Sequence, residues 1–356
     1  MKHACFLWIS LSVGITLFNC SSSENLGADD GQSMRLPGMP AVESKQAIAE
    51  PDGLIGVEPG STYRLFYLQD SIRVVVDDPY TPAELSVSPH TLVIYALPNG
   101  NSIEWTMGKA KNETDNWHYH IQYIDAQTQW LRANTSEKFI VAYLEAPKMS
   151  WPAWKKSHAN YGEMITQMMD SLRTLYPDAH MYLNSHSGGG SLINGFIESR
   201  ERIPSWVKRI GFIDSNYGYD TEIGAKLNQW LNADKERHLS VFAYNDSIAL
   251  YEGKPFVSAT GGTWFRSKMM LIDLSQEREF FQQTLNSEIT EYRSVGDQVL
   301  VLLKENPGRE IFHTEQVELN GFIHSVLFGT EFENKGYQYF GAHCYDDYIS
   351  LETPSL

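Results

Sequence analysis

Hydrophobic residues along the chain fall into short runs that predict β-strands. Positions 63–68 and 72–76 are rich in aromatic and β-branched residues and are separated by Gln69-Asp70-Ser71, which predicts a hairpin. A continuous apolar run, typical of a strand buried on both faces, covers 91–97. Further strands are expected at 139–144, 180–183, 210–213, 239–244 and 299–303. The segment 311–319 could pair with the last of these strands.

Segments of helical character lie between these runs. In 159–175, Met164, Met168, Leu172 and Leu175 would share one helical face. Further helices are expected at 119–132, 191–199, 221–233 and 265–284. Strands that alternate with helices predict an α/β fold, in which helices cover both faces of a mostly parallel central sheet. We assign 61–356 to this single domain.

The first sixty residues have a different pattern. Lys2 and His3 precede an uncharged, mostly apolar stretch at 4–18, too short for a membrane span and suited to a signal peptide. The stretch ends at Cys20, so residues 1–19 resemble the signal peptide of a bacterial lipoprotein, which implies lipidation of Cys20. Residues 20–60 are rich in Ser, Gly, Pro and acidic residues, as in a flexible tether. We expect an exported protein, periplasmic or at the outer membrane or cell surface, held to the membrane only by its lipid.

Composition narrows the range of partners. The 44 acidic residues outnumber the 28 Lys and Arg, giving a formal net charge of −16, which argues against nucleic-acid binding because phosphates require a basic face. Only three cysteines are present, and two of them lie in the first twenty residues, so no disulfide framework is expected.

Candidate chemistry centres on the segment 182–191, where a short strand runs into Ser-His-Ser-Gly-Gly-Gly and then into a helix. Ser187 lies at the turn between small residues, Ser185 two positions before it and Gly189 two positions after it. A strand–turn–helix of this kind exposes a serine hydroxyl above the backbone. The helix that follows favours negative charge at its N-terminus, and Gly188 would give one oxyanion N–H.

This segment resembles the nucleophile elbow of the α/β-hydrolase superfamily, G-x-S-x-G, with Ser185 in place of the first glycine. The resemblance covers roughly residues 62–345. It implies a triad in the order Ser, acid, His, with Ser187 as nucleophile. Asp246, after the strand 239–244, is preferred as the acid, and Asp214 is the alternative.

The resemblance places the histidine on a loop after the last strand. His324 is preferred over His313 and His343. A second oxyanion donor would come from the loop after 91–97, where Gly100 and Asn101 are the candidates. We expect no metal and no cofactor.

The leading hypothesis is a secreted or membrane-tethered serine hydrolase that cleaves carboxylic esters of small molecules or glycans. A serine peptidase or amidase with the same triad is the second hypothesis. The third is a catalytically silent surface-binding protein of the same fold, which would normally lack a complete triad.

The lipid anchor is tested by replacing the acylated residue. Cys20→Ala should move the protein from the detergent phase to the aqueous phase in a partitioning experiment, because the acyl chains attached at Cys20 supply the expected membrane affinity. Wild-type protein that stays aqueous after signal cleavage would contradict the prediction.

Overall fold

Parallel strands form the middle of a large sheet whose two edges are antiparallel. The structure is a computed structural model that describes residues 62–112, 115, 120–352 and 356. The predicted signal peptide 1–19, the tether 20–60 and Cys20 lie outside these residues. Among the described residues, the strands are β1 Tyr63–Leu68, β2 Ile72–Asp77, β3 His90–Ala96, β4 Lys138–Glu145, β5 His180–His186, β6 Val207–Ile213, β7 His238–Tyr244, β8 Leu250–Tyr251, β9 Lys254–Pro255, β10 Phe280–Thr284, β11 Ile289–Ser294 and β12 Val299–Lys304.

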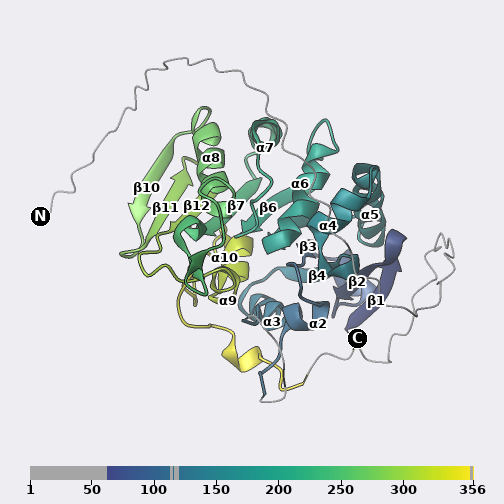
Figure 1. Cartoon of the computed structure of the whole chain (residues 1–356). Coiled ribbons are helices and arrows are strands. Elements are labelled where there is room, and N and C mark those ends of the chain that lie inside the picture. The colour runs from purple at the N-terminus through teal and green to yellow at the C-terminus, as the bar shows by residue number, and fades with distance from the viewer. Residues whose placement is uncertain (1–61, 113–114, 116–119, 353–355) are drawn as a thin grey trace, which may run out of the picture. The chain divides into compact units, whose positions relative to one another are not determined.

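The large sheet has the order β1-β2-β4-β3-β5-β6-β7-β12-β11-β10. Strands β4, β3, β5, β6, β7 and β12 are parallel to one another. The other pairings in this sheet are antiparallel, and β8 and β9 form a separate hairpin. The parallel strands occupy the middle of the sheet (Figure 1), so their carboxyl ends meet at one edge. Ser187 follows β5, which lies near the middle of the strand order.

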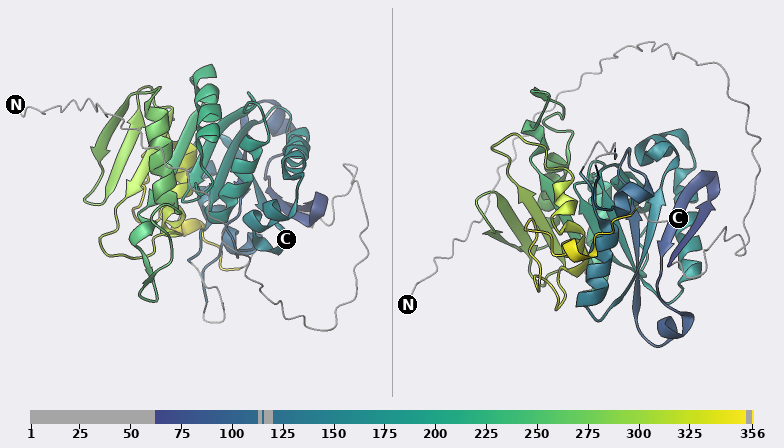
Figure 2. Two further views of the ribbon diagram at one scale, coloured as in Figure 1. Left: turned by 45° about the horizontal axis from the view of Figure 1, so that its top comes forward. Right: turned by 90° about the horizontal axis from the view of Figure 1, so that it is seen from below.

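Helices cover both faces of the sheet (Figure 2). The described helices are α1 Pro82–Ser86, α2 Ile103–Met107, α3 Ile124–Asn134, α4 Trp151–Ser157, α5 Tyr161–Leu175, α6 Gly190–Glu198, α7 Thr221–Ala233, α8 Thr263–Ser275, α9 Glu315–Glu318 and α10 Gly321–Leu327. One buried cluster joins α4–α8 to one face, and a second joins α2, α3, α9 and α10 to the other. The predicted fold class, α/β with a mostly parallel sheet and helices on both faces, is confirmed.

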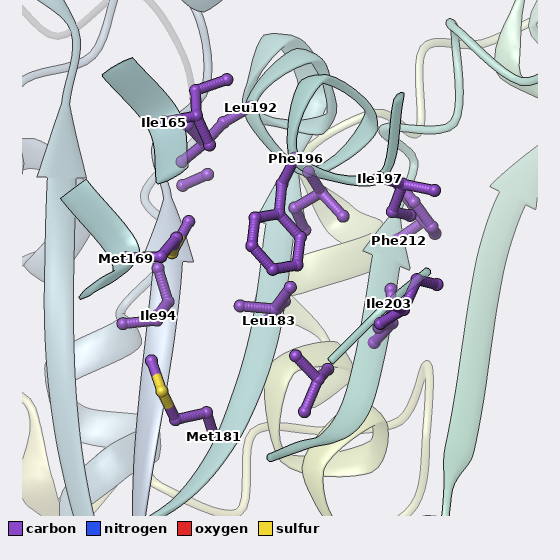
Figure 3. Packing of buried hydrophobic residues seen from close by; sticks show 14 of the residues in the cluster. Ile94, Ile165, Met169, Met181, Leu183, Leu192, Phe196, Ile197, Ile203 and Phe212 are labelled. Carbon is purple, nitrogen blue, oxygen red and sulfur yellow. The ribbon is translucent and has the colours of Figure 1, made fainter. Parts of the chain in front are cut away.

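Side-chain alternation along the buried strands builds these two clusters. Leu92 and Ile94 of β3 enter the first cluster, whereas Val93 and Tyr95 enter the second. Figure 3 shows the first cluster, where the ring of Phe196 on α6 lies over Leu183 of β5. Because both faces of β3 and β5 are buried, their carboxyl ends are held firmly where the site lies.

Three sequence-based expectations are corrected. The helix expected at 265–284 ends at Ser275, and Phe280–Thr284 forms the outer strand β10, whose polar side chains face solvent. The segment 311–319 forms no strand: it contains α9, and β12 pairs instead with β11 and β7. On α5, Leu175 is 39% exposed, and the buried residues are Ile165, Met168, Met169 and Leu172.

The packing of α6 on the sheet contributes to the stability of the protein next to Ser187. Phe196→Ala should lower the free energy of unfolding by about 3–5 kcal/mol, because Phe196 is fully buried and leaves a cavity. Phe281, which is 64% exposed on β10, is the matched control, and Phe281→Ala should change stability by about 0.5 kcal/mol or less. Equal losses in chemical denaturation would contradict this account.

Candidate active site

Ser187 occupies a sharp turn between β5 and α6. Its φ is +52°, in the left-handed region that non-glycine residues rarely adopt. The glycines that follow allow the helix to start close to neighbouring strands. A Cβ on Gly189 would lie 2.1 Å from the carbonyl oxygen of Ala96, and one on Gly190 would lie 1.8 Å from that of Ser215. The backbone conformation of this segment therefore has the features expected of a nucleophile elbow.

Ser185 takes the position of the first glycine in the related motif. Its side chain is fully buried, and its Oγ lies 2.8 Å from Ser215 Oγ and donates to the Gly211 carbonyl at 3.4 Å. Ser215 Oγ also donates to the Ser185 carbonyl at 3.2 Å. The hydroxyl is thus accommodated by bonds to β6 and the loop after it, so a serine is tolerated where space is limited.

Asp214 and His313 form the charged pair of this region. Asp214 directly follows β6, has a φ of +44° and is fully buried. His313 lies between β12 and α9, and its Nδ1 contacts the Asp214 Oδ2 atom. These residues were the sequence-based alternatives for the acid and the base, and the structure brings them together.

His186 links this pair to the elbow. Its Nε2 donates to the carbonyl oxygen of His313 at 3.0 Å, and the two imidazole rings have centroids 4.5 Å apart. Burial lowers the pKa of His186 well below its ordinary value, so its ring is neutral at pH 7. His313 is therefore held beside the residue that immediately precedes Ser187. The Ser187 carbonyl accepts the Gly190 N–H, whereas its hydroxyl makes no hydrogen bond within the described residues. Catalytic hydrogen bonds are often long when no substrate is bound.

The structure corrects the preferred histidine, His324. This residue lies on α10 in the cluster on the other face of the sheet, with 2% of its surface exposed. Its Nδ1 lies 3.1 Å from the Tyr337 hydroxyl, and its Nε2 has no partner among the described residues. The ring stacks on Phe242 and Tyr339, and burial lowers its pKa to about 4. His324 is a core residue and meets neither Ser187 nor Asp246.

Asp246 follows β7 as expected, but its side chain has partners other than the predicted histidine. Its Oδ2 accepts the backbone N–H of Thr263 at 2.8 Å, at the start of α8, and a Cβ on Gly262 would lie 2.1 Å from the same oxygen. The Thr263 hydroxyl contacts both Asp214 and Asp246. Burial and the negative charge of Asp214 raise the pKa of Asp246 to about 6. Asp246 therefore caps the start of α8, and within the described part of the chain no hydrogen bond or ion pair joins it to a histidine.

The predicted oxyanion loop is present, but other groups occupy the expected positions. The N–H of Gly100 donates to the Met149 carbonyl at 2.9 Å, and Asn101 is 95% buried, outside the cavity at Ser187. Asn99 lies there instead: a Cβ on Gly188 would be 2.1 Å from Asn99 Oδ1. The Gly188 N–H lies in the first turn after Ser187, and the Asn99 side-chain amide packs against Gly188 at the same cavity.

His343, the remaining histidine candidate, belongs to a surface cluster. Its Nδ1 lies 3.1 Å from Asp346 and its Nε2 lies 3.6 Å from Glu318.

Within the described ranges, no group of His, Cys, Asp and Glu has the arrangement of a metal site. No helix of these ranges is long and apolar enough to cross a membrane.

A cavity of about 410 Å³ opens beside Ser187. Its lining residues come from the elbow, α4, α6 and the loops after β3 and β6: Asn99, Pro152, Lys155, Ser187, Gly188, Ser191, Asn194, Tyr217 and Gly218. A substrate bound here would contact Ser187 and the proposed oxyanion donors together.

Sequence reasoning missed His186, Thr263 and Asn99. His186 lies within the elbow motif and Asn99 within the predicted oxyanion loop, so their positions along the chain were informative. Thr263 gave no such signal, because only the tertiary structure brings the start of α8 to Asp214.

Comparison with known proteins gives matches only among solved structures. No family model and no curated protein matches the chain. A cold-adapted esterase from an Arctic intertidal metagenomic library is 10% identical, with a TM-score of 0.36 over 68% of this chain and 83% of that one. A thermostable esterase is 13% identical (TM-score 0.42, 72% and 59%), and a siderophore hydrolase from Aspergillus nidulans is 12% identical (TM-score 0.39, 77% and 96%). At this level of sequence and structural similarity, the activity of this chain has to be argued from its own site.

The pKa of Asp246 gives a test of its structural role. Between about pH 4 and pH 6 the folded protein keeps a proton on Asp246 that the unfolded chain releases, so the contribution of Asp246 to wild-type stability falls as the pH rises. Asp246→Asn keeps an oxygen for the cap and removes this cost. Its stability relative to wild type should rise across this window by up to about 3 kcal/mol.

Thermal unfolding of both proteins at pH 4, 5, 6 and 7 measures this difference. Asp220→Asn, at the exposed N-cap of α7, is the matched control for changing a capping carboxylate to an amide. A difference between Asp246→Asn and wild type that is constant over the pH range would exclude the raised pKa.

Proposed function

We propose that this protein is a serine hydrolase that cleaves carboxylic esters, with Ser187 as nucleophile, His313 as base and Asp214 as the orienting acid. The observation that carries the proposal is the contact between Asp214 and His313, made beside the elbow that holds Ser187. The three residues follow β5, β6 and β12, whose carboxyl ends lie at the same edge of the sheet.

The contact of Asp214 with Nδ1 determines what His313 can do. A carboxylate at Nδ1 holds the proton on that nitrogen, so Nε2 presents its lone pair as a base. In the proposed mechanism, Nε2 takes the Ser187 proton as Oγ attacks the ester carbonyl, and Asp214 stabilises the imidazolium that forms. Nε2 then protonates the leaving alcohol. Water repeats the sequence on the acyl-enzyme and releases the acid.

Negative charge on the carbonyl oxygen requires donors that are already in place. The Gly188 N–H and the Asn99 side-chain amide lie at the cavity with Ser187 and could both point to that oxygen. The N-terminus of α6 adds favourable potential at the same point. Removal of one such donor typically slows catalysis by about 10²–10³-fold.

The proposal includes export and anchoring. The signal-like residues 1–19 and the acylation candidate Cys20 support a periplasmic or surface-exposed lipoprotein that meets small-molecule or glycan esters outside the cytoplasm. The net charge of −16 supports the exclusion of nucleic acid as a partner.

Substitution of the proposed triad tests the mechanism. Ser187→Ala and His313→Ala should each lower kcat on a p-nitrophenyl ester by about 10⁶-fold, and the double variant should be no slower, since the members act as a unit. Asp214→Asn should cost about 10⁴-fold, because the amide favours the wrong imidazole tautomer. Fluorophosphonate labelling of wild type, absent in Ser187→Ala, would identify the acylated residue.

Two matched controls address the residues first preferred from sequence. Asp246→Asn and His324→Phe should each keep kcat within about tenfold, since neither side chain contacts His313. A loss for Asp246→Asn as large as that for Asp214→Asn would return the acid role to Asp246. Wild type that neither labels nor hydrolyses would favour the silent binding protein. Faster turnover of aryl amides than of matched esters would favour the peptidase or amidase.

A further inference from the structure

The cavity beside Ser187 has a wall of polar residues. Ser191 and Asn194 are three residues apart on α6, which places them on one side of the helix, and Ser187 lies in the turn just before it. All three line the cavity, and Asn99 faces them from the loop after β3. A pocket for a plain alkyl group would present apolar side chains at these positions.

Asn194 is the most unusual member of this wall. Its side chain is 99% buried, yet neither Oδ1 nor Nδ2 has a hydrogen-bond partner among the described residues. Gly218 packs on the amide so closely that a Cβ there would lie 2.6 Å from Nδ2. A buried amide without partners is costly, so the site gains from any ligand group that supplies both a donor and an acceptor.

The lysine that lines the cavity is already paired with a carboxylate. Lys155 lines it, but its Nζ pairs with Glu198 at 2.5 Å and lies over the Tyr161 ring. Pro152 and Tyr217 supply the apolar surface. An uncharged hydrogen-bonding group therefore fits this cavity better than a carboxylate or an ammonium group.

The short segment between Ser187 and Asn194 sets the distance between the nucleophile and the buried amide. Asn194 lies in the second turn of α6, and Ser187 lies in the tighter turn before the helix. At a rise of about 1.5–2 Å per residue, the seven residues separate the two backbones by at most about 10–14 Å, and helical side chains lean back toward the N-terminus. A group bound at Asn194 would thus lie several bonds from the scissile carbonyl.

We infer that Asn194 and Ser191 form a polar subsite that selects esters bearing an uncharged hydroxyl or carboxamide group several bonds from the reacting carbonyl. The inference rests on the proposed ester hydrolysis at Ser187 and adds the substrate class. Asn194 binds this group by donating from Nδ2 and accepting at Oδ1, and Ser191 contributes its hydroxyl.

Paired substrates test the subsite. p-Nitrophenyl esters of acids with a terminal carboxamide, four to six carbons long, are compared with alkyl and carboxylate-terminated esters of the same length. A second series places a terminal hydroxyl on the alcohol side. In at least one series, wild type should favour the uncharged polar ester by about tenfold to a hundredfold in kcat/KM, as expected when a buried amide gains or lacks its partner.

Variants then assign the preference to Asn194. Asn194→Leu should reduce the polar-to-alkyl ratio to about one or below, and Asn194→Ala, which removes the amide without adding bulk, guards against misfolding of the leucine variant. Asn228→Leu is the matched control: Asn228 is a buried asparagine on α7, away from the cavity, whose Oδ1 accepts from Arg278. This control should keep the wild-type ratio.

The outcomes distinguish a failure of the polar-subsite proposal from a failure of the proposed hydrolase activity. Wild type that labels with fluorophosphonate but shows no preference for the polar ester overturns the subsite and leaves the hydrolase intact. A preference that persists in both Asn194 variants overturns the role of Asn194. A stronger preference for the carboxylate-terminated ester overturns the uncharged class. Wild type that neither labels nor turns over any ester overturns the subsite together with the proposed function.

Discussion

The close approach of the α6 N-terminus to the ends of β3 and β6 is the constraint on which the site depends. Gly189 and Gly190 lie so near the carbonyls of Ala96 and Ser215 that any side chain there would collide with backbone. The chain must therefore turn sharply at Ser187, at a φ that costs of order 1–3 kcal/mol. The buried face of α6 offsets this strain, because Leu192, Ile193, Phe196 and Ile197 pack into the cluster on that side of the sheet.

Two carboxylates lie behind this turn, and their surroundings separate their roles. Asp214 and Asp246 follow the adjacent parallel strands β6 and β7, and the Thr263 hydroxyl lies between them. Like charges this close in a buried site resist ionising together. Asp214 gains His313 as a compensating partner, whereas Asp246 has only the α8 N-terminus and keeps a raised pKa. In the proposed triad, the contact with His313 thus favours Asp214 over Asp246 as the acid.

The sequence predicted the parallel core well, because strands such as β4 and helices such as α7 have clear periodicity and ends. It missed β10 and β11, whose polar side chains at the sheet edge lack that pattern. The elbow was found because its constraint is local. The histidine that contacts Asp214 was only the second choice, because tertiary structure alone brings a loop residue to its partner. The apolar residues on both sides of His324 in Gly321–Leu327 did indicate a buried helix, a signal that favours a core role for that residue.

Recognition and chemistry share one rigid element in the proposed site. The turn that presents Ser187 continues directly into the helix that carries Ser191 and Asn194, so the distance from nucleophile to polar subsite is fixed by backbone hydrogen bonds and varies little with loop motion. The opposite wall, with Asn99 and Tyr217, comes from loops that follow β3 and β6. Changes in those loops could alter the width of the cavity, whereas the length of substrate that spans from Ser187 to Asn194 would stay set by the helix.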